Sequence, residues 1–242
     1  MQVLGGNTIM KLKLLVAVGA MASLSACAST YVGTPYTAPD VPVTRVAVAD
    51  DALPENVIAR QAASTMSNFG LIGGLIDAGV QASRKDAVNE ALDTIGYTPE
   101  ETLEALIVER FAGTGVTASV VEGPDREKRE FLVEYPVGPA GTQAHFDLVI
   151  QQFGYMQAGG NAWRPAVLAD VRMVDATTGA TLLENRIALN WVDSPAGVIA
   201  LSPNPAYAFA NREDMVTNPQ LLAEGIDDAL ATVVDAAIGL IR

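Results

Sequence analysis

The stretch PAVLADVRMVDATTGATLLENRIALNW, residues 165–191, predicts a β-hairpin and the register of the sheet around it. Two runs of alternating character flank Thr177-Thr178-Gly179, which suits a three-residue hairpin loop because Gly179 can adopt the left-handed conformation. Ala176 then lies opposite Ala180, and stepping outward along both strands gives every further pair.

In this register the two faces of the hairpin differ in chemistry. One face brings opposite charges together, pairing Arg172 with Glu184 and Asp170 with Arg186. The other face is apolar, with the pairs Met173–Leu183, Ala169–Ile187 and Val167–Leu189, and with Asn185 opposite Val171 as its one polar residue. Turn chemistry, charge and hydrophobicity all agree on this register, which favours it over a slip by one residue.

Residues 98–113 predict a helix. Thr98 can cap it, Pro99 suits its first turn, Glu101 completes a capping box and Gly113 ends it. Leu103, Leu106, Ile107 and Phe111 then share one face, which we expect to pack on the sheet.

Apolar patterns predict the remaining elements. Asn218 and Pro219 begin an amphipathic helix at the end of the sequence, residues 53–66 are weakly helical, and strands are expected at 45–49, 116–122, 131–135 and 146–155. Helices packed on a mainly antiparallel or mixed sheet make an α+β fold. We expect one such domain over residues 44–242.

Residues 67–82 form a second apolar segment, which is rich in glycine and interrupted by Asp77. The segment is too short and too polar to span a bilayer. It is either a helix buried in the core of the domain or an apolar surface that lies against lipid or a partner. The candidate surface residues are Phe69, Leu71, Ile72, Leu75 and Ile76.

The start of the sequence has the architecture of a bacterial signal peptide. Lys11 and Lys13 form a short basic region, and an apolar run that is too short for a membrane span follows and ends at Leu24. Met10 is the expected true start because it begins the basic region, whereas residues 1–9 carry no charge.

Leu24-Ser25-Ala26-Cys27 resembles the lipobox of Gram-negative lipoproteins. In that family, signal peptidase II cuts before the cysteine after its sulfur has received diacylglycerol. The resemblance implies cleavage between Ala26 and Cys27, removal of residues 1–26, and a membrane anchor of acyl chains such as palmitate on Cys27. Several acyl chains anchor a protein stably, so no transmembrane helix is needed.

Residues 27–43 comprise this lipidated N-terminus and a proline-containing, semi-extended tether. The residue after the cysteine is Ala28, and the Asp that retains such lipoproteins in the inner membrane is absent. The resemblance therefore implies a location on the periplasmic leaflet of the outer membrane.

Charge argues against nucleic-acid partners. The 242 residues carry a formal charge of −13, and removal of residues 1–26 takes away two lysines, leaving 13 basic against 28 acidic residues, or −15. Nucleic-acid phosphates and anionic headgroups repel such a polyanion, so membrane attachment has to come from the acyl chains.

The sequence offers little for catalysis. With Cys27 lipidated no thiol remains, and His145 is the only histidine. His145 and Asp147 could orient each other as a base or in a metal site, although a strand-edge hydrogen bond is the commoner role of such a pair. Nucleotide-binding and hydrolase motifs are missing from the sequence. We expect no enzymatic activity, no cofactor and no metal.

Two loops differ in their expected roles. Residues 194–215 are long for a loop in a compact domain and contain the candidate partner contacts Pro203, Pro205, Tyr207 and Phe209. Packing of this loop over the sheet edge by its own aromatic residues is the equal alternative. GPDREKRE, residues 123–130, is interpreted as a solvated charged turn.

Residues 44–192 resemble the domain of envelope lipoproteins related to the curli-secretion protein and to penicillin-binding-protein activators. The similar features are RVAVAD from Arg45, AHFDLVIQQFGYM from Ala144, and the strand that ends at Asp175 before Thr178-Gly179. The resemblance implies a non-catalytic module that binds envelope proteins in assembly or maintenance. The alternative is a carrier of an apolar ligand or lipid, and the sequence leaves the oligomeric state open.

Overall fold

The computed structural model describes residues 30–62, 70–126, 128–158, 160–192 and 194–242, with the side chains of residues 70–81 left out. Its strands are β1 (Arg45–Ala49), β2 (Ile58–Gln61), β3 (Thr117–Val121), β4 (Ala144–Gln157), β5 (Trp163–Asp175), β6 (Thr181–Leu189) and β7 (Ile199–Leu201). Its helices are α1 (Gly70–Asp93), α2 (Pro99–Gly113), α3 (Arg212–Thr217) and α4 (Pro219–Gly239), with a 3-10 turn η2 (Pro205–Tyr207).

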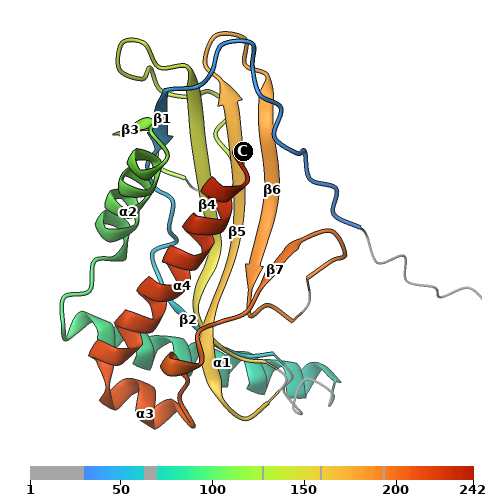
Figure 1. Cartoon of the computed structure of the whole chain (residues 1–242). Helices are drawn as coiled ribbons and strands as arrows, with labels where there is room; N and C mark the ends of the chain where they lie inside the picture. Colours follow the sequence, from blue (N-terminus) through green and yellow to red (C-terminus); the bar gives the residue numbers. More distant parts are fainter. Residues whose placement is uncertain (1–29, 63–69, 127, 159, 193) are drawn as a thin grey trace, which may run out of the picture.

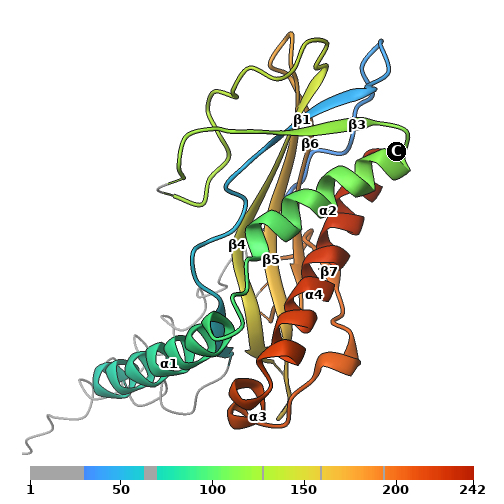
Figure 2. The same cartoon turned by 90° about the vertical axis from the view of Figure 1, so that its left-hand side faces the viewer.

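All seven strands join one mixed sheet in the order β3-β1-β4-β5-β6-β7, and β2 pairs with the far end of β4. Among the three longest strands, β5 lies between β4 and β6 and is antiparallel to both, whereas the short strands on either side run parallel to their neighbours. Helices α2 and α4 lie on one face of this sheet (Figures 1 and 2). The α+β fold predicted from the sequence is confirmed.

The hairpin register predicted from residues 165–191 is confirmed from Val167–Leu189 inward to Met173–Leu183. A bulge then shifts the pairing by one residue, so that Asp175 Nα–H donates to the carbonyl of Ala180 and the loop spans residues 176–179. The predicted Ala176–Ala180 pair is therefore wrong. Gly179 has the expected positive φ, 72°.

Helix α2 packs on the sheet through the apolar face predicted from its sequence. Leu103, Ile107 and Phe111 of α2 are buried, and Leu106 is partly buried. The predicted capping box is not formed, because Thr98 makes no capping hydrogen bond through its side chain. Instead, the carboxylate of Glu100 accepts from the backbone N–H groups of Ala52 and Leu53 at 2.8 and 2.9 Å, and so attaches α2 to the loop after β1.

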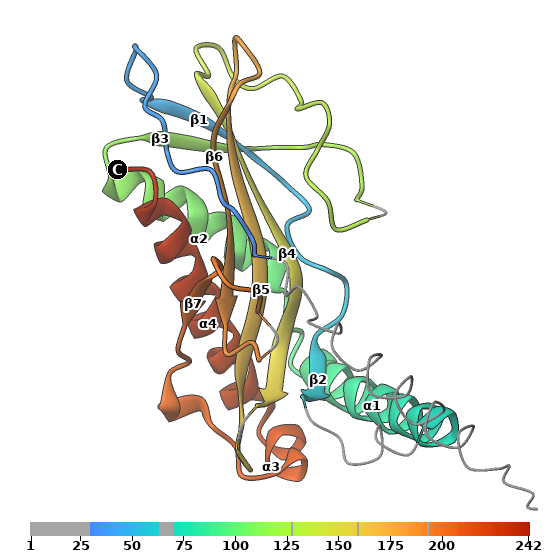
Figure 3. The same cartoon turned by 90° about the vertical axis from the view of Figure 1, so that its right-hand side faces the viewer.

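Helix α1 and strand β2 depart from the expected elements. The helix expected at residues 53–66 is wrong over residues 53–62, because Ile58–Gln61 pair in parallel with Gly154–Gln157 of β4. Residues 63–66 lie outside the described part of the chain. Helix α1 projects from the lower end of the sheet (Figures 2 and 3). Its second half packs on the domain through the buried residues Val88, Ala91 and Leu92.

The loop between β3 and β4 covers the second face of the sheet, opposite the helices (Figure 3). The solvated turn expected at residues 123–130 is wrong in this respect, since the Arg126 side chain is 1% exposed and pairs with Asp147, 0% exposed, at 2.8 Å. Asp147 also accepts from Leu132 Nα–H and the Tyr135 hydroxyl. Residues 131–135 are therefore held on the sheet by hydrogen bonds to the side chain of Asp147, and the strand expected there is not formed.

The buried Arg126–Asp147 pair predicts a large loss of stability when one partner is neutralised. We expect Asp147→Asn to lower the free energy of unfolding by about 3–5 kcal/mol, because Arg126 stays buried without a counter-charge. Asp235→Asn is the matched control: it removes a charge partner of Arg110 in an exposed pair and should cost much less, because exposed ion pairs contribute little to stability. Urea unfolding followed by circular dichroism measures both values, and equal losses would contradict the prediction.

Asp175 predicts a pH-dependent contribution of the hairpin turn. Hydrogen bonds from the N–H and hydroxyl of Thr178 and the N–H of Thr177 lower the pKa of Asp175. Because the folded-state pKa is the lower one, this stabilisation is present above the unfolded pKa of about 3.9 and is lost as the pH falls through the folded pKa. Wild type should therefore be more stable than Asp175→Asn at pH 6, and the difference should shrink between about pH 4 and pH 2. A difference that is constant over this range in urea titrations would refute the turn's role.

Candidate functional site

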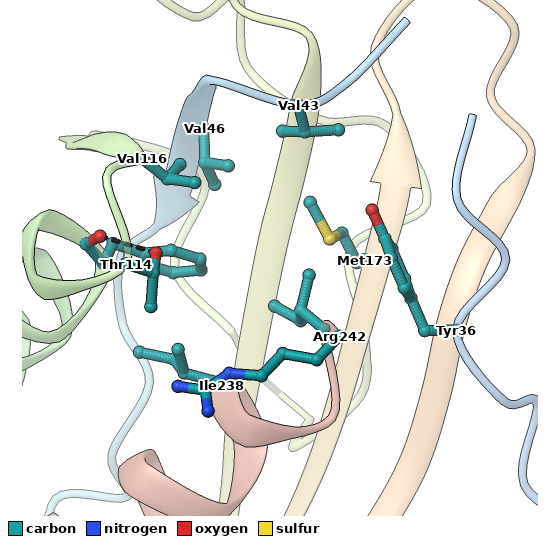
Figure 4. Close-up of a pocket in the computed structure, with 10 residues that line it drawn as sticks. Tyr36, Val43, Val46, Thr114, Val116, Met173, Ile238 and Arg242 are labelled. Carbon is teal, nitrogen blue, oxygen red and sulfur yellow. Dashed lines mark hydrogen bonds between the residues drawn. The ribbon is translucent and has the colours of Figure 1, made fainter. Parts of the chain in front are cut away.

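An apolar pocket of about 350 Å³ opens between the sheet and the ends of the two covering helices (Figure 4). This volume is near the lower end of the range for small-molecule sites. Its walls come from the N-terminal segment, β1, β5, the turn after α2 and the end of the chain, namely Tyr36, Val43, Val46, Phe111, Thr114, Val116, Met173, Ile238, Ile241 and Arg242.

The pocket exists because both helices stop before the sheet does. Helix α2 ends at Gly113, and the chain turns through Gly115, whose φ is 84°, into β3. Helix α4 ends at Gly239. The apolar face of the sheet at Val46 and Met173, which the helices cover elsewhere, is left with the N-terminal segment as its remaining cover.

Three polar side chains border the pocket. The Thr114 hydroxyl donates to the carbonyl of Phe111 at 2.7 Å, so its proton is already engaged. Burial raises the pKa of Tyr36 above its usual value, and a tyrosine hydroxyl is already neutral at physiological pH. Arg242 is exposed and extends along the side of the pocket where α4 ends (Figure 4). The arrangement offers apolar contact with a cation at its border.

The part of the predicted contact loop around η2 packs on the first half of α4 near Gly225, whereas the pocket lies at the end of that helix, at Ile238. Figure 1 shows η2 and α3 beside the start of α4. Phe209 is 5% exposed; its ring centroid lies 5.4 Å from that of Tyr155, and it forms a bridge with Trp163. Phe209 therefore belongs to the core, as the alternative interpretation of this loop expects. Pro203 and Tyr207 are half-buried, and Pro205 is exposed in η2.

The other sequence-predicted sites fall partly outside the described residues. Ala26, Cys27 and Phe69 are outside them. Helix α1 includes four of the candidate surface residues, but their side chains lie outside the described part of the structure: Leu71, Ile72, Leu75 and Ile76. The lining residues given for the pocket come from other segments.

His145 and Asp147 share a face of β4, and both contact Tyr135. The His145 ring stacks on Tyr135, with centroids 5.0 Å apart and planes at 15°, and burial lowers its pKa. Asp147 binds Arg126, Leu132 and Tyr135. Over the described ranges, no three His, Cys, Asp or Glu side chains gather as a metal site requires, and no helix is long and apolar enough to cross a membrane.

Sequence reasoning missed the pocket because its walls come from five distant segments. The available signal was two apolar residues at strand ends: Val43, just before the predicted strand at 45–49, and Val116, the first residue of the one at 116–122. Both look like ordinary strand-end residues until the ends of α2 and α4 are placed beside them.

Comparisons with known proteins give no family. No family model and no curated protein matches the sequence. Among solved structures, a PelC dodecamer from Paraburkholderia phytofirmans is 8% identical, with a TM-score of 0.37 over 88% of this chain and 99% of that one. A Xanthomonas campestris protein of the DUF330 family is 10% identical, with a TM-score of 0.36 over 60% of this chain and 61% of that one, which is less than two thirds of its length. Likeness at this level transfers neither fold nor function.

The pocket predicts binding of a small aromatic probe. We expect N-phenyl-1-naphthylamine to fluoresce on binding to the wild-type protein and to bind at least tenfold more weakly to Val43→Trp, because the indole would fill the pocket. Val41→Trp is the matched control: position 41 lies in the same segment, is 66% exposed and does not line the pocket. Equal binding to all three proteins would place the probe elsewhere.

Proposed function

We propose that this chain is a lipid-anchored, non-catalytic binding module of the cell envelope, held by Cys27 in the periplasmic leaflet of the outer membrane. Cleavage between Ala26 and Cys27 and acylation of the cysteine follow from the resemblance of Leu24–Cys27 to the lipobox. Its mature charge of −15 leaves acyl chains as the means of attachment.

The apolar pocket is the observation that carries the binding role. Seven of its ten lining residues are aliphatic, Met or Phe, and the three polar ones lack a nucleophile paired with a base. A cavity of about 350 Å³ suits one or two apolar side chains, the kind of anchor that dominates protein–protein affinity. The proposed ligand is therefore an apolar side chain of an envelope protein, with Arg242 beside it for an acidic neighbour.

The same pocket favours a second candidate function, carriage of a small apolar ligand. A single short acyl segment would be buried by the same aliphatic walls, and the guanidinium of Arg242 would face an anionic head. The two functions differ in what the pocket holds when the protein is isolated from its membrane.

Crosslinking in cells followed by affinity purification from the membrane separates the two functions. On the leading proposal, a defined protein partner is recovered with wild type and with Val41→Trp, and at least fivefold less with Val43→Trp. Recovery of free protein with a stoichiometric apolar molecule detected by mass spectrometry would favour the carrier instead.

The anchor is tested in the same preparations. Wild type should fractionate with the outer membrane and carry the mass of acyl chains on Cys27, whereas Cys27→Ser should remain unprocessed or appear in the soluble fraction. A processed Cys27→Ser protein that still fractionates with the outer membrane would remove the lipobox from the proposal.

A further inference from the structure

The N-terminal segment is bound to the domain by backbone hydrogen bonds along β6 and the turn before β7. Thr34 and Glu184 exchange N–H···O bonds of 2.7 and 3.0 Å, and Thr37 N–H donates to Leu182 at 2.8 Å. Tyr31 N–H donates to the carbonyl of Ala196 at 2.8 Å. From residue 31 onward, the expected tether is therefore docked along this side of the sheet (Figure 3).

Two glycines allow this docking. A Cβ at Gly33 would lie 2.2 Å from Asn185 Oδ1, and a Cβ at Gly197 would lie 2.1 Å from the carbonyl oxygen of Tyr31. Asn185, the polar exception of the hairpin, donates to the Thr34 carbonyl at 3.4 Å. The close approach on both sides of Tyr31 shows that the segment packs tightly on the domain.

The position of Tyr31 on the domain limits the distance between the domain and Cys27. Tyr31 is half-buried, and its ring lies 5.5 Å from the guanidinium of Arg186. Cys27 precedes it by four residues. Four extended residues span about 14 Å, so the Cα of Cys27 lies within that distance of Tyr31 whatever path the chain takes.

We infer that the side of the domain formed by residues 30–34, 190–192 and 194–197, here called the anchor side, faces the lipid surface. This inference rests on the acylation of Cys27 in the proposed function. Val32 and Val192 on this side are 84% and 52% exposed, which suits contact with the membrane interface. The opposite edge, β3, is four strands from β6, or about 19 Å at the spacing of strands, and faces away from the lipid.

Thiol labelling of the acylated protein tests this orientation. Because Cys27 is the only cysteine and its sulfur is blocked by a thioether to diacylglycerol, one introduced cysteine is the only free thiol. We compare a nitrobenzoxadiazole label on Val192→Cys with one on Thr117→Cys, an exposed position of β3. Vesicles of phosphatidylethanolamine and phosphatidylglycerol contain a quencher lipid with a nitroxide near the headgroup. Quenching at position 192 should exceed that at position 117 at least threefold.

A second variant tests whether docking of the N-terminal segment causes this orientation on the membrane. Gly33→Val should displace the segment from Asn185 and reduce the difference in quenching between positions 192 and 117 to less than half, with acylation unchanged by mass spectrometry. Gly160→Val is the matched control, because a Cβ there meets no atom within 4 Å, and it should preserve the difference.

The outcomes separate the two claims. Equal quenching at positions 192 and 117 in acylated protein overturns the orientation and leaves the lipid anchor standing. Absence of acyl chains on Cys27 overturns both. An orientation that persists in Gly33→Val would refute the docked segment as its cause.

Discussion

The pairing of β5 with β6 is the constraint on which the other layers depend. Side chains alternate between the faces of a strand, so one register assigns every residue of both strands to a side. Met173, Ala169 and Val167 turn toward α2 and α4, while Arg172, Asp170 and their partners on β6 turn away. Because the first face is apolar, it needs a helix layer. Because the second carries charges, its cover has to supply hydrogen bonds as well as apolar contact.

The charged face explains the loop that crosses it. Asp147 sits on β4 with no exposed surface, and a carboxylate in that position is costly unless it is paired and hydrogen-bonded. Arg126, Leu132 and Tyr135 all come from the loop between β3 and β4. Close by, the amide of Gln151, at the β4 bulge, donates to both Asp170 and the carbonyl of Arg129. The loop is thus held on the sheet by polar contacts where the helices are held by apolar ones.

Elements whose signal is local could be predicted from the sequence. Apolar residues recur with the period of a strand in the β5–β6 hairpin and with the period of a helix in α2 and α4. The strand predicted at Arg45–Ala49 is observed as β1. Strand β2 was missed because four residues become a strand only through pairing with Gly154–Gln157, almost a hundred positions away. Arg126 looked solvated because its counter-charge lies 21 residues further along the chain. The pocket depends on the residues at which α2 and α4 end, and the periodicity of a sequence locates helix ends only to within a few residues.

The N-terminal segment connects the candidate site with the proposed anchor. Tyr36 and Val43, which border the pocket, belong to the same stretch that pairs with β6 through Thr34 and Thr37 and that leads back to Cys27. A ligand that contacts Tyr36 gains that contact only while the segment is docked. Binding and docking therefore stabilise each other by the same free energy, since linkage is reciprocal. A partner bound in the pocket would favour the docked conformation of the N-terminal segment. Conversely, docking of the segment would complete the pocket wall before the partner binds.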